Sequence, residues 1–577
     1  QFGTGKISNT ALFTGTSQVQ AVAVNLSAGG SLDMSGWTFA TWTSGTDTIT
    51  VTGSTGGETI VGSSLIDRFV VSDTNQVSAA DRYNGAAGND ILQVGLAGAG
   101  TGIDLSAAAS DGVNGFLSVE AITFVNTSGT STATFDAAQF GTGKIAATAA
   151  ITGTTTAAQA LVVNMATAGA LNMSGWTFAN WTAGTDTITV NGSAGADTIT
   201  GPIQGATILA GAGNDTLIVS ATTQVQSNDR YDGGDDIDTL QIGTVGAGVA
   251  VVLTTAASDG IDGFVNIEAI SFVNTSTTST ATFNASQFGT GKISTASTIT
   301  GTAAGVQGLA VNLAAGNSLD LSGLTFSTWV SGTDTISLTG STGSETIVGT
   351  SQIDRFVVGA TNQVSAGDRY DGGAGNDVIQ VGSTTAAVSV DLSAAASDGI
   401  DGFISVEGIT FINAAGTATA TFNANQFGTG KIASTAIVTG TSSIQAIVVN
   451  VDSGGSADLS GWTFPTWTSG TDTITVNGSS GAETFTGAIQ GTTILAGAGN
   501  DTLIVSNTTQ VQVSDRYDGG ADNDTLQIGL VGAGTSISLA AAATNGTDGF
   551  VNIEGVTFVN TSGTSTATVG SAQLGTG

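Results

Sequence analysis

The sequence has 577 residues, of which only 9% are charged, and its 44 acidic and 10 basic residues give a net charge of −34. Such a charge argues against nucleic acids and anionic membrane surfaces as partners, because phosphate and lipid head groups would be repelled, and it favours cations. The sequence has no cysteine and no histidine, which excludes Cys/His zinc sites and Ser-His-Asp or Cys-His catalysis.

No apolar run approaches the roughly 18 residues of a membrane helix, and no basic-then-apolar leader opens the chain. We therefore expect no membrane insertion, and we expect any secretion signal to lie outside this sequence. With 85 glycines and only two prolines among many Thr, Ser, Ala and Val residues, the composition predicts short β-strands and tight turns rather than long helices.

Four long tandem repeats organise the chain. The phrase Gln-Phe-Gly-Thr-Gly opens each of them, and it returns in altered form at Gln573. We name the repeats A1 (1–138), B1 (139–286), A2 (287–425) and B2 (426–572), with 573–577 starting another. A1 resembles A2 and B1 resembles B2, so the full period is the 286 residues from Gln1 to Gln287. Neither end shows an atypical capping repeat, and we expect the sequence to be part of a longer array.

Much of each repeat consists of short β-branched or aromatic runs that alternate with period two. In A1 these include GFLSVEAITFVN (115–126) and STATFDAAQF (131–140), and in B1 they include ALVVNMA (160–166) and TDTITV (185–190). Gly, Ser, Asn and Asp separate the runs, which indicates strands of about 4–7 residues joined by turns. We predict an all-β fold, a continuous parallel β-solenoid. The alternative is a string of β-sandwich modules joined by β-rolls, which the lack of Pro-rich or charged linkers disfavours.

A nine-residue phrase recurs within every repeat. Its fullest form is DRYDGGAGNDVIQVG (368–382), in which Asp368 and Asp377 flank Gly372, Gly373 and Gly375. A1 has AAGNDILQVG after Gly85, B2 has DGGADNDTLQIG after Tyr517, and B1 has DRYDGGDDIDTLQIG from Asp229. Glycine allows left-handed backbone angles that turn carbonyl oxygens inward, and aspartate adds a carboxylate, so the phrase offers the hard oxygen ligands that calcium prefers.

This phrase matches the G-G-x-G-x-D-x-U-x nonapeptide of calcium-binding β-helices, and the chain resembles the repeats-in-toxin (RTX) family of secreted bacterial proteins. The resemblance covers about a quarter of each repeat. It implies a calcium-bound β-roll and export through a type I secretion channel, with folding outside the cell where calcium is millimolar. Ala86 and Asp235 depart from the family's glycine pattern, which implies weaker binding there.

The spacing of the acidic residues predicts how the turns stack. In A1 they lie at Glu58, Asp67, Asp81 and Asp90, with gaps of 9, 14 and 9 residues. Nine residues make half a coil, so we expect Glu58 to stack on Asp81 along one side and Asp67 on Asp90 along the other. The 14-residue gap predicts a small loop around residues 73–76.

The B repeats contain one additional nonapeptide. We expect Asp197, Asp215 and Asp238 to stack in B1, with Ala206 where a further acid would lie, and Thr492 in the same place in B2. We also expect an insertion of this length to preserve the stacking.

These patterns predict several calcium ions per repeat. The expected metal-ligating residues are Glu58, Asp67, Asp81, Gly85, Gly88, Asp90, Asp197, Asp215, Asp229, Asp238, Glu345, Asp354, Asp368, Gly372, Gly373, Gly375, Asp377, Glu483, Asp501, Asp515 and Asp524. Glu58, Glu345 and Glu483 are expected to be the weakest, because a longer carboxylate replaces aspartate.

Other repeated residues have structural interpretations. All six arginines follow an aspartate and are expected to point outward, either neutralising the acidic edge or forming salt bridges between chains. Trp37 and its equivalents could stack sugars, but Leu324 takes that place in A2, which favours a core role. Glu120, Glu268, Glu407 and Glu554 recur once per repeat, whereas an enzyme has one active site, so we expect no catalysis.

The sequence therefore predicts an extracellular, calcium-stabilised structural protein of a bacterial cell surface: an S-layer, a filament or an adhesin stalk. The expected partners are copies of itself, associating laterally or end to end, and surface polysaccharide. The alternative is a carbohydrate- or ice-binding adhesin segment. Thr-x-Thr phrases such as that at Thr46 could form an ice-binding face, but their spacing is irregular.

Overall fold

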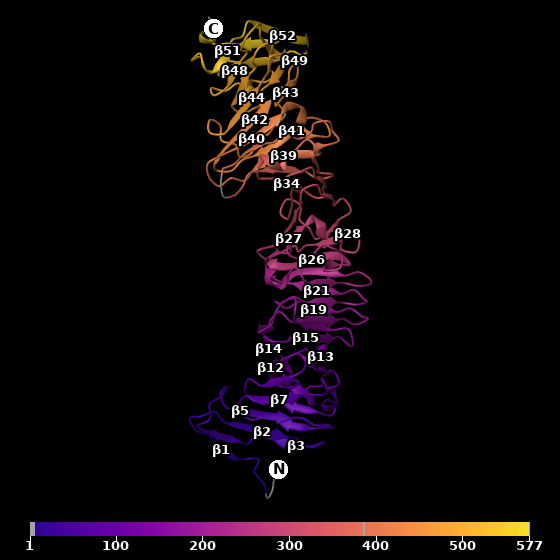
Figure 1. The fold of residues 1–577 in the computed structure, drawn as a ribbon. Helices are drawn as coiled ribbons and strands as arrows, with labels where there is room; N and C mark the ends of the chain where they lie inside the picture. The colour runs from indigo at the N-terminus through magenta and orange to yellow at the C-terminus, as the bar shows by residue number, and fades with distance from the viewer. Residues whose placement is uncertain (1–5, 385–386, 576–577) are drawn as a thin grey trace. The chain divides into compact units, whose positions relative to one another are not determined.

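The computed structural model describes residues 6–384 and 387–575 and is an all-β parallel solenoid. The phrase at Gln1–Gly5 and the last two residues of the 573–577 segment lie outside the described residues. Each strand pairs in parallel with a strand one coil further along the chain, for example β2 (Ala21–Asn25) with β5 (Thr48–Thr52) and β5 with β7 (Asp67–Val71). Figure 1 shows these strands as successive arrows. The predicted fold class is confirmed.

Two compact units make up the chain. Unit 1 comprises Gln1–Ala281, Gln287–Gln307 and Phe326–Trp329, and unit 2 comprises Thr282–Ser286, Gly308–Thr325 and Val330–Gly577. The four repeat boundaries remain a prediction from the sequence.

In repeat A1, two sheets carry the acidic turns. The larger contains β2, β5, β7, β9 (Ile91–Val94), β12 (Val119–Phe124), β14 (Ile145–Thr152) and β17 (Thr177–Ala179). The smaller contains β3 (Ser31–Asp33), β6 (Thr59–Val61), β8 (Arg82–Asn84) and β11 (Gly115–Leu117).

In repeat B1, both sheets are long. One contains β10 (Gly102–Asp104), β13 (Thr130–Asp136), β15 (Ala158–Asn164), β18 (Thr187–Asn191), β20 (Thr207–Leu209), β22 (Arg230–Asp232) and β25 (Gly263–Val265). The other contains β16 (Ala170–Asn172), β19 (Thr198–Thr200), β21 (Thr216–Val219), β23 (Thr239–Ala247), β26 (Ile267–Ser276) and β28 (Ile293–Thr300).

Unit 2 repeats both arrangements. Its A2 sheets contain β32 (Thr335–Thr339), β34 (Asp354–Val358), β36 (Val378–Val381), β39 (Val406–Phe411) and β41 (Ile432–Thr439), and β33 (Thr346–Val348), β35 (Arg369–Asp371) and β38 (Gly402–Ile404). Its B2 sheets contain β42 (Ile444–Asn450), β44 (Thr473–Asn477), β46 (Thr492–Leu495), β48 (Arg516–Asp518) and β51 (Gly549–Val551), and β45 (Thr484–Thr486), β47 (Thr502–Val505), β49 (Thr525–Ala533) and β52 (Gly555–Ser562).

The core follows from the period-two alternation of the strands. In β5 the side chains of Ile49 and Val51 are buried, while the threonines between them are half-buried. Each fully buried aliphatic side chain contributes about 1.5–3 kcal/mol relative to exposure. Trp37, Trp176, Trp462 and Leu324 are buried at equivalent places, which confirms the core interpretation of these residues.

The register of the strands shows how long each coil is. Asp197 and Asp215 contact each other across a coil of 18 residues, two nonapeptides, and Asp67 and Asp90 do so across 23. The five extra residues of the longer coil contain a 3-10 turn at Thr74–Gln76, capped by Asp73. The small loop predicted at residues 73–76 is confirmed.

The nonapeptide inserted in each B repeat has a second effect. In A1 the Arg-Tyr strand β8 joins the sheet of β3 and β6, whereas in B1 its equivalent β22 joins the sheet of β18 and β20. The expected stacking is preserved across the insertion, but the exchange of sheets was not predicted. Because nine residues are half a coil, every later strand moves to the opposite sheet.

Helical structure within the described ranges is limited to eight 3-10 turns: Thr74–Gln76, Ala137–Gln139, Thr222–Gln224, Ala285–Gln287, Thr361–Gln363, Ala424–Gln426, Thr508–Gln510 and Ser571–Gln573. No helix in the described part of the chain is long and apolar enough to span a membrane.

Candidate metal centre

The predicted acidic residues form ladders along the edges of the sheets. Where an acidic residue lies one coil earlier on the ladder, its backbone N–H donates a hydrogen bond to the next carboxylate. Asp81 Oδ1 lies 2.7 Å from the N atom of Glu58, and Asp90 Oδ1 lies 2.7 Å from that of Asp67. Both stacking pairs predicted for A1, on opposite sheets, are confirmed.

The B repeats form the longer ladder that was predicted. The N–H of Asp197 donates to Asp215 Oδ1 over 2.6 Å, and the N–H of Asp215 donates to Asp238 Oδ1 over 2.8 Å. Across the coil, Asp229 Oδ1 accepts from the N–H of Ala206, which occupies the predicted place of the missing acid.

The second period forms the same ladders. The donor and acceptor pairs are Glu345 with Asp368, Asp354 with Asp377, Glu483 with Asp501, Asp501 with Asp524, and Thr492 with Asp515.

In four ladders, a glutamate one coil later accepts a hydrogen bond from the last aspartate of the ladder. Glu120 Oε2 accepts from the N–H of Asp90 over 2.7 Å, and the equivalent pairs are Glu268 with Asp238, Glu407 with Asp377 and Glu554 with Asp524. These are the glutamates that the sequence assigned to structure because they recur once per repeat. In this position each one satisfies a backbone donor at the end of a ladder.

One set of buried aspartates was missed by the sequence analysis. Asp186 accepts from the N–H groups of Gln159 and Thr182, and Asp47 and Asp472 make the equivalent contacts. All three are nearly inaccessible, as is Asp334 at the same place in A2. The recurrence of Gly-Thr-Asp-Thr-Ile in every repeat was the available signal.

Hydrogen bonding divides most of the ladder carboxylates into two classes. In the first class, both oxygens accept from backbone N–H groups. Asp368 binds the N–H groups of Glu345 and Ser365, and the other members are Asp81, Asp197, Asp229 and Asp515. These carboxylates hold the turn and the coil before it together.

In the second class, one buried oxygen has no hydrogen-bond partner among the described residues. These atoms are Oδ2 of Asp90, Asp215, Asp238, Asp377, Asp501 and Asp524, Oδ1 of Asp67, and Oε2 of Glu58 and Glu345. A buried acceptor without a partner costs about 1–3 kcal/mol, and more when it is charged. Such oxygens need a proton or a cation.

Two of the predicted glycines, Gly88 and Gly375, lie where a side chain cannot fit. A β-carbon on Gly88 would lie 2.3 Å from the carbonyl oxygen of Leu65 in the preceding coil, and one on Gly375 would lie 2.5 Å from that of Gln352. The equivalent residue in B1 is Asp236, which adopts a φ of 83°. The departure from the glycine pattern in B1 is therefore at Asp236 and not at Asp235. Ala86 also takes the left-handed region, with a φ of 72°.

Gly85 and Gly372 lie beside the unpartnered oxygens. A β-carbon on Gly85 would lie 2.3 Å from Asp90 Oδ2 and 2.1 Å from the carbonyl oxygen of Ser118. On Gly372 it would lie 2.4 Å from Asp377 Oδ2 and 2.2 Å from the carbonyl oxygen of Ser405. Gly373 has a φ of 80° and donates its N–H to Asp371.

Burial raises the pKa of most ladder carboxylates, because it removes the charged form from water. The pKa of Asp90 and of Asp377 rises to about 8, although the N–H groups of Asp67 and Asp354 partly oppose the shift. It rises to about 7 in Asp229, Asp238, Asp354 and Asp515 and to about 6 in Asp67 and Asp501. Burial also raises the pKa of Asp215, Asp524, Glu58 and Glu345.

The donor set fits a hard cation. Calcium takes six to eight oxygen ligands from carboxylates, backbone carbonyls and water at about 2.3–2.6 Å. Within residues 6–384 and 387–575, no three acidic side chains form a group suited to a metal ion. A cation between two turns would therefore be held by one or two carboxylates, such as Asp90, together with backbone carbonyls such as that of Ser118.

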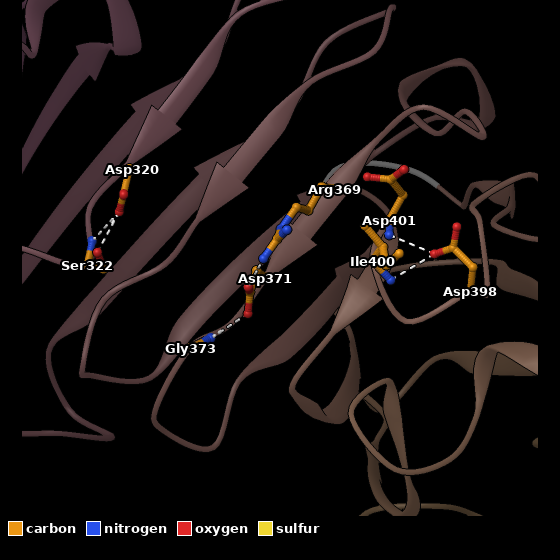
Figure 2. A network of polar contacts seen from close by, with 8 residues as sticks. All are labelled: Asp320, Ser322, Arg369, Asp371, Gly373, Asp398, Ile400 and Asp401. Atoms are coloured by element: carbon orange, nitrogen blue, oxygen red, sulfur yellow. Dashed lines mark hydrogen bonds and ion pairs between the residues drawn. The ribbon is translucent and has the colours of Figure 1, made fainter.

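The arginines and the exposed aspartates belong to local contacts outside the ladders. Arg369 pairs with Asp371 on the same strand at 2.6 Å, and Asp371 also accepts from Gly373, as Figure 2 shows. Arg230 and Arg516 make the same pair with Asp232 and Asp518. Asp398 caps its own loop by accepting from the N–H groups of Ile400 and Asp401 (Figure 2). These ion pairs are half-buried, with arginine side chains about one-third exposed.

No protein-family model matches this chain, and no curated protein matches it significantly.

Proposed function

We propose that this protein is a secreted, calcium-binding structural protein of a bacterial cell surface, without enzymatic activity. Calcium would bind between stacked Asp/Gly turns and hold the coils of the solenoid together. The observation that carries the proposal is the recurrence, in every repeat, of buried ladder carboxylates with an oxygen that lacks a partner among the described residues. The match of these turns to the RTX nonapeptide supports calcium over other cations.

The net charge of −34 supports the same function. In the absence of cations, like charges along the ladders oppose folding, so the chain would cross a secretion channel unfolded. Millimolar calcium outside the cell would then drive folding, because metal-binding free energy adds to folding free energy. Bound calcium would also reduce the repulsion between copies of the protein.

Repetition supports a structural role over a catalytic one. Each ladder glutamate, such as Glu120, accepts a backbone hydrogen bond at the same place in its repeat. The A and B repeats, each present twice, offer recurring surfaces for lateral or end-to-end association with copies of this chain. An S-layer, a filament and an adhesin stalk that contacts surface polysaccharide are the forms that such association would take.

The test is far-UV circular dichroism of the protein in EGTA at pH 8, followed by a calcium titration with magnesium as the control cation. We expect a coil-like spectrum that turns to β-structure between about 0.1 and 10 mM calcium. A β-spectrum that is unchanged in EGTA would contradict the proposal. Negative-stain electron microscopy in calcium would then distinguish sheets, filaments and single rods.

A further inference from the structure

The four ladders that contain Asp90, Asp238, Asp377 or Asp524 are each followed, one coil later, by a segment without the nonapeptide pattern. The segment is a polar residue, then Val or Ile, then the ladder glutamate. It occurs as Ser118-Val119-Glu120, Asn266-Ile267-Glu268, Ser405-Val406-Glu407 and Asn552-Ile553-Glu554. We call each of these places a ladder cap.

The first residue of every cap has a left-handed backbone. The φ angles of Ser118, Asn266, Ser405 and Asn552 are 47°, 49°, 49° and 51°. This conformation costs a non-glycine residue about 1–2 kcal/mol. Its recurrence at all four caps in the described chain indicates that the surrounding structure holds it in place.

The left-handed residue brings its carbonyl oxygen to the nonapeptide beneath it. A β-carbon built on Gly85, the first glycine of the A1 nonapeptide, would lie 2.1 Å from the carbonyl oxygen of Ser118. One built on Gly233 in B1 would lie 2.3 Å from the carbonyl oxygen of Asn266. The corresponding distances at Gly372 and Gly519 are both 2.2 Å. Only glycine leaves room for this approach.

The same point lies beside the unpartnered aspartate oxygen. The Oδ2 atoms of Asp90, Asp238, Asp377 and Asp524 are 2.3, 2.4, 2.4 and 2.6 Å from it. These side chains are at most 1% exposed, and in the described structure none of the four Oδ2 atoms has a hydrogen-bond partner. A buried carboxylate oxygen and a carbonyl oxygen thus converge without a donor between them, while the glutamate adds a second negative charge.

We propose that each ladder cap is a separate divalent-cation site, in which calcium is bound by the aspartate Oδ2 and the carbonyl oxygen of the left-handed residue. The site differs from one between two nonapeptides, because one of its walls is a segment without the nonapeptide pattern. The inference rests on the proposed calcium-binding function and specifies where a distinct set of ions lies. The competing occupant is a proton on the aspartate that donates to the same carbonyl oxygen.

The test counts calcium ions bound to the full chain at saturating calcium, by elemental analysis after equilibrium dialysis. The variant carries D90N, D238N, D377N and D524N. Each asparagine keeps the Oδ1 that accepts from the acidic residue below and offers an N–H to the cap carbonyl. We expect this variant to bind four fewer calcium ions than the native chain and to keep its β-spectrum in calcium.

A matched control carries D215N and D501N. These aspartates also have an unpartnered Oδ2 within the described residues, but the next coil above each is another nonapeptide. The control should keep the four cap ions. If the fourfold variant binds as many calcium ions as the native chain, the cap sites are refuted while the proposed function stands. If the native chain binds no calcium, both are refuted.

A second variant guards against loss of folding. It carries E120Q, E268Q, E407Q and E554Q, in which the amide oxygen still accepts the N–H of the ladder aspartate. Loss of the glutamate charge should lower the affinity for four of the calcium ions about tenfold and leave the affinity for the others unchanged. A uniform change in the affinity of all ions, or no change, would overturn the proposal.

Discussion

At the scale of single residues, two aspartates of one nonapeptide phrase have opposite surroundings. Asp368 directs both carboxylate oxygens at backbone N–H groups. Asp377 uses Oδ1 in the same way, but its Oδ2 faces the carbonyl oxygen of Ser405, and burial raises its pKa to about 8. Both oxygens of the first carboxylate have backbone donors, whereas one oxygen of the second needs a proton or a cation.

Asp377→Asn is expected to have opposite effects in chelator and in calcium. In EGTA at pH 8, where the native chain is expected to be unfolded, the amide N–H can donate to the carbonyl of Ser405, so the equilibrium should shift towards the folded state by on the order of 1 kcal/mol. In calcium the variant should be less stable than the native chain, because a ligand is lost. The β-content by circular dichroism in EGTA and urea denaturation in calcium measure the two effects.

Asp368→Asn provides the comparison within the same phrase. Its amide group would place a donor against a backbone donor, so we expect a loss of about 1–3 kcal/mol of stability in calcium and no gain of β-structure in EGTA. If the two variants respond alike to calcium, the distinction between the two classes of carboxylate is wrong.

Sequence spacing was enough to predict which acids stack, because the nine-residue half-coil fixes the register. It could not predict which oxygen lacks a partner. That depends on the carbonyl of Ser118, a residue far along the chain from Asp90, and on a left-handed backbone that serine and asparagine do not require. It also missed Asp186 and its equivalents, which stand in a threonine-rich phrase without the nonapeptide glycines.

At the scale of elements, four of the 3-10 turns absorb the residues by which a 23-residue coil exceeds an 18-residue one. In the turn at Thr222–Gln224, the buried Gln224 accepts from the N–H groups of Ser220 and Ala221 and donates to the carbonyl of Gly201 in the preceding coil. One side chain therefore closes the turn and fixes it to its neighbour.

Gln224→Ala should lower the free energy of unfolding by about 2–3 kcal/mol, because three backbone groups, one of them in a buried contact, lose their partner. Gln226→Ala is the control: its side chain donates a single exposed bond to Ile203, and its loss should cost less than about 0.5 kcal/mol. Denaturant unfolding in calcium measures both. Equal losses would show that the turn does not hold the coils together.

The sequence predicted the loop at residues 73–76 and the extra nonapeptide of the B repeats, since both are changes of length in a repeated pattern. It did not predict the exchange of sheets. Strands β8 and β22 are nearly identical in sequence, so the sheet that each one joins is decided by the number of half-coils before it.

At the scale of the whole molecule, buried carboxylates with raised pKa values link stability to pH. The folded chain keeps protons that the unfolded chain releases above its carboxyl pKa of about 4. Their contribution to stability is therefore complete below about pH 4 and is lost as the pH rises through the folded pKa values of about 6–8.

In EGTA, the chain should show a melting transition at pH 5 and lose it by pH 8.5, where the raised-pKa carboxylates are ionised and the chain is expected to be unfolded. Calcium should restore it at pH 8.5 and have little effect at pH 5, where protons occupy the carboxylates. Differential scanning calorimetry at matched ionic strength measures both. A melting temperature that rises with pH in EGTA would show that the ladder carboxylates are stabilised as anions without a cation.

Because of the exchange of sheets, an odd or even number of added nonapeptides decides which sheet the later strands of a repeat join. One added nonapeptide transfers the Arg-Tyr strand and everything after it to the opposite sheet, and a second would return them. Gain or loss of a single nonapeptide by recombination would therefore move the strands that follow it from one sheet to the other. Changes made in pairs would alter only the length of the repeat.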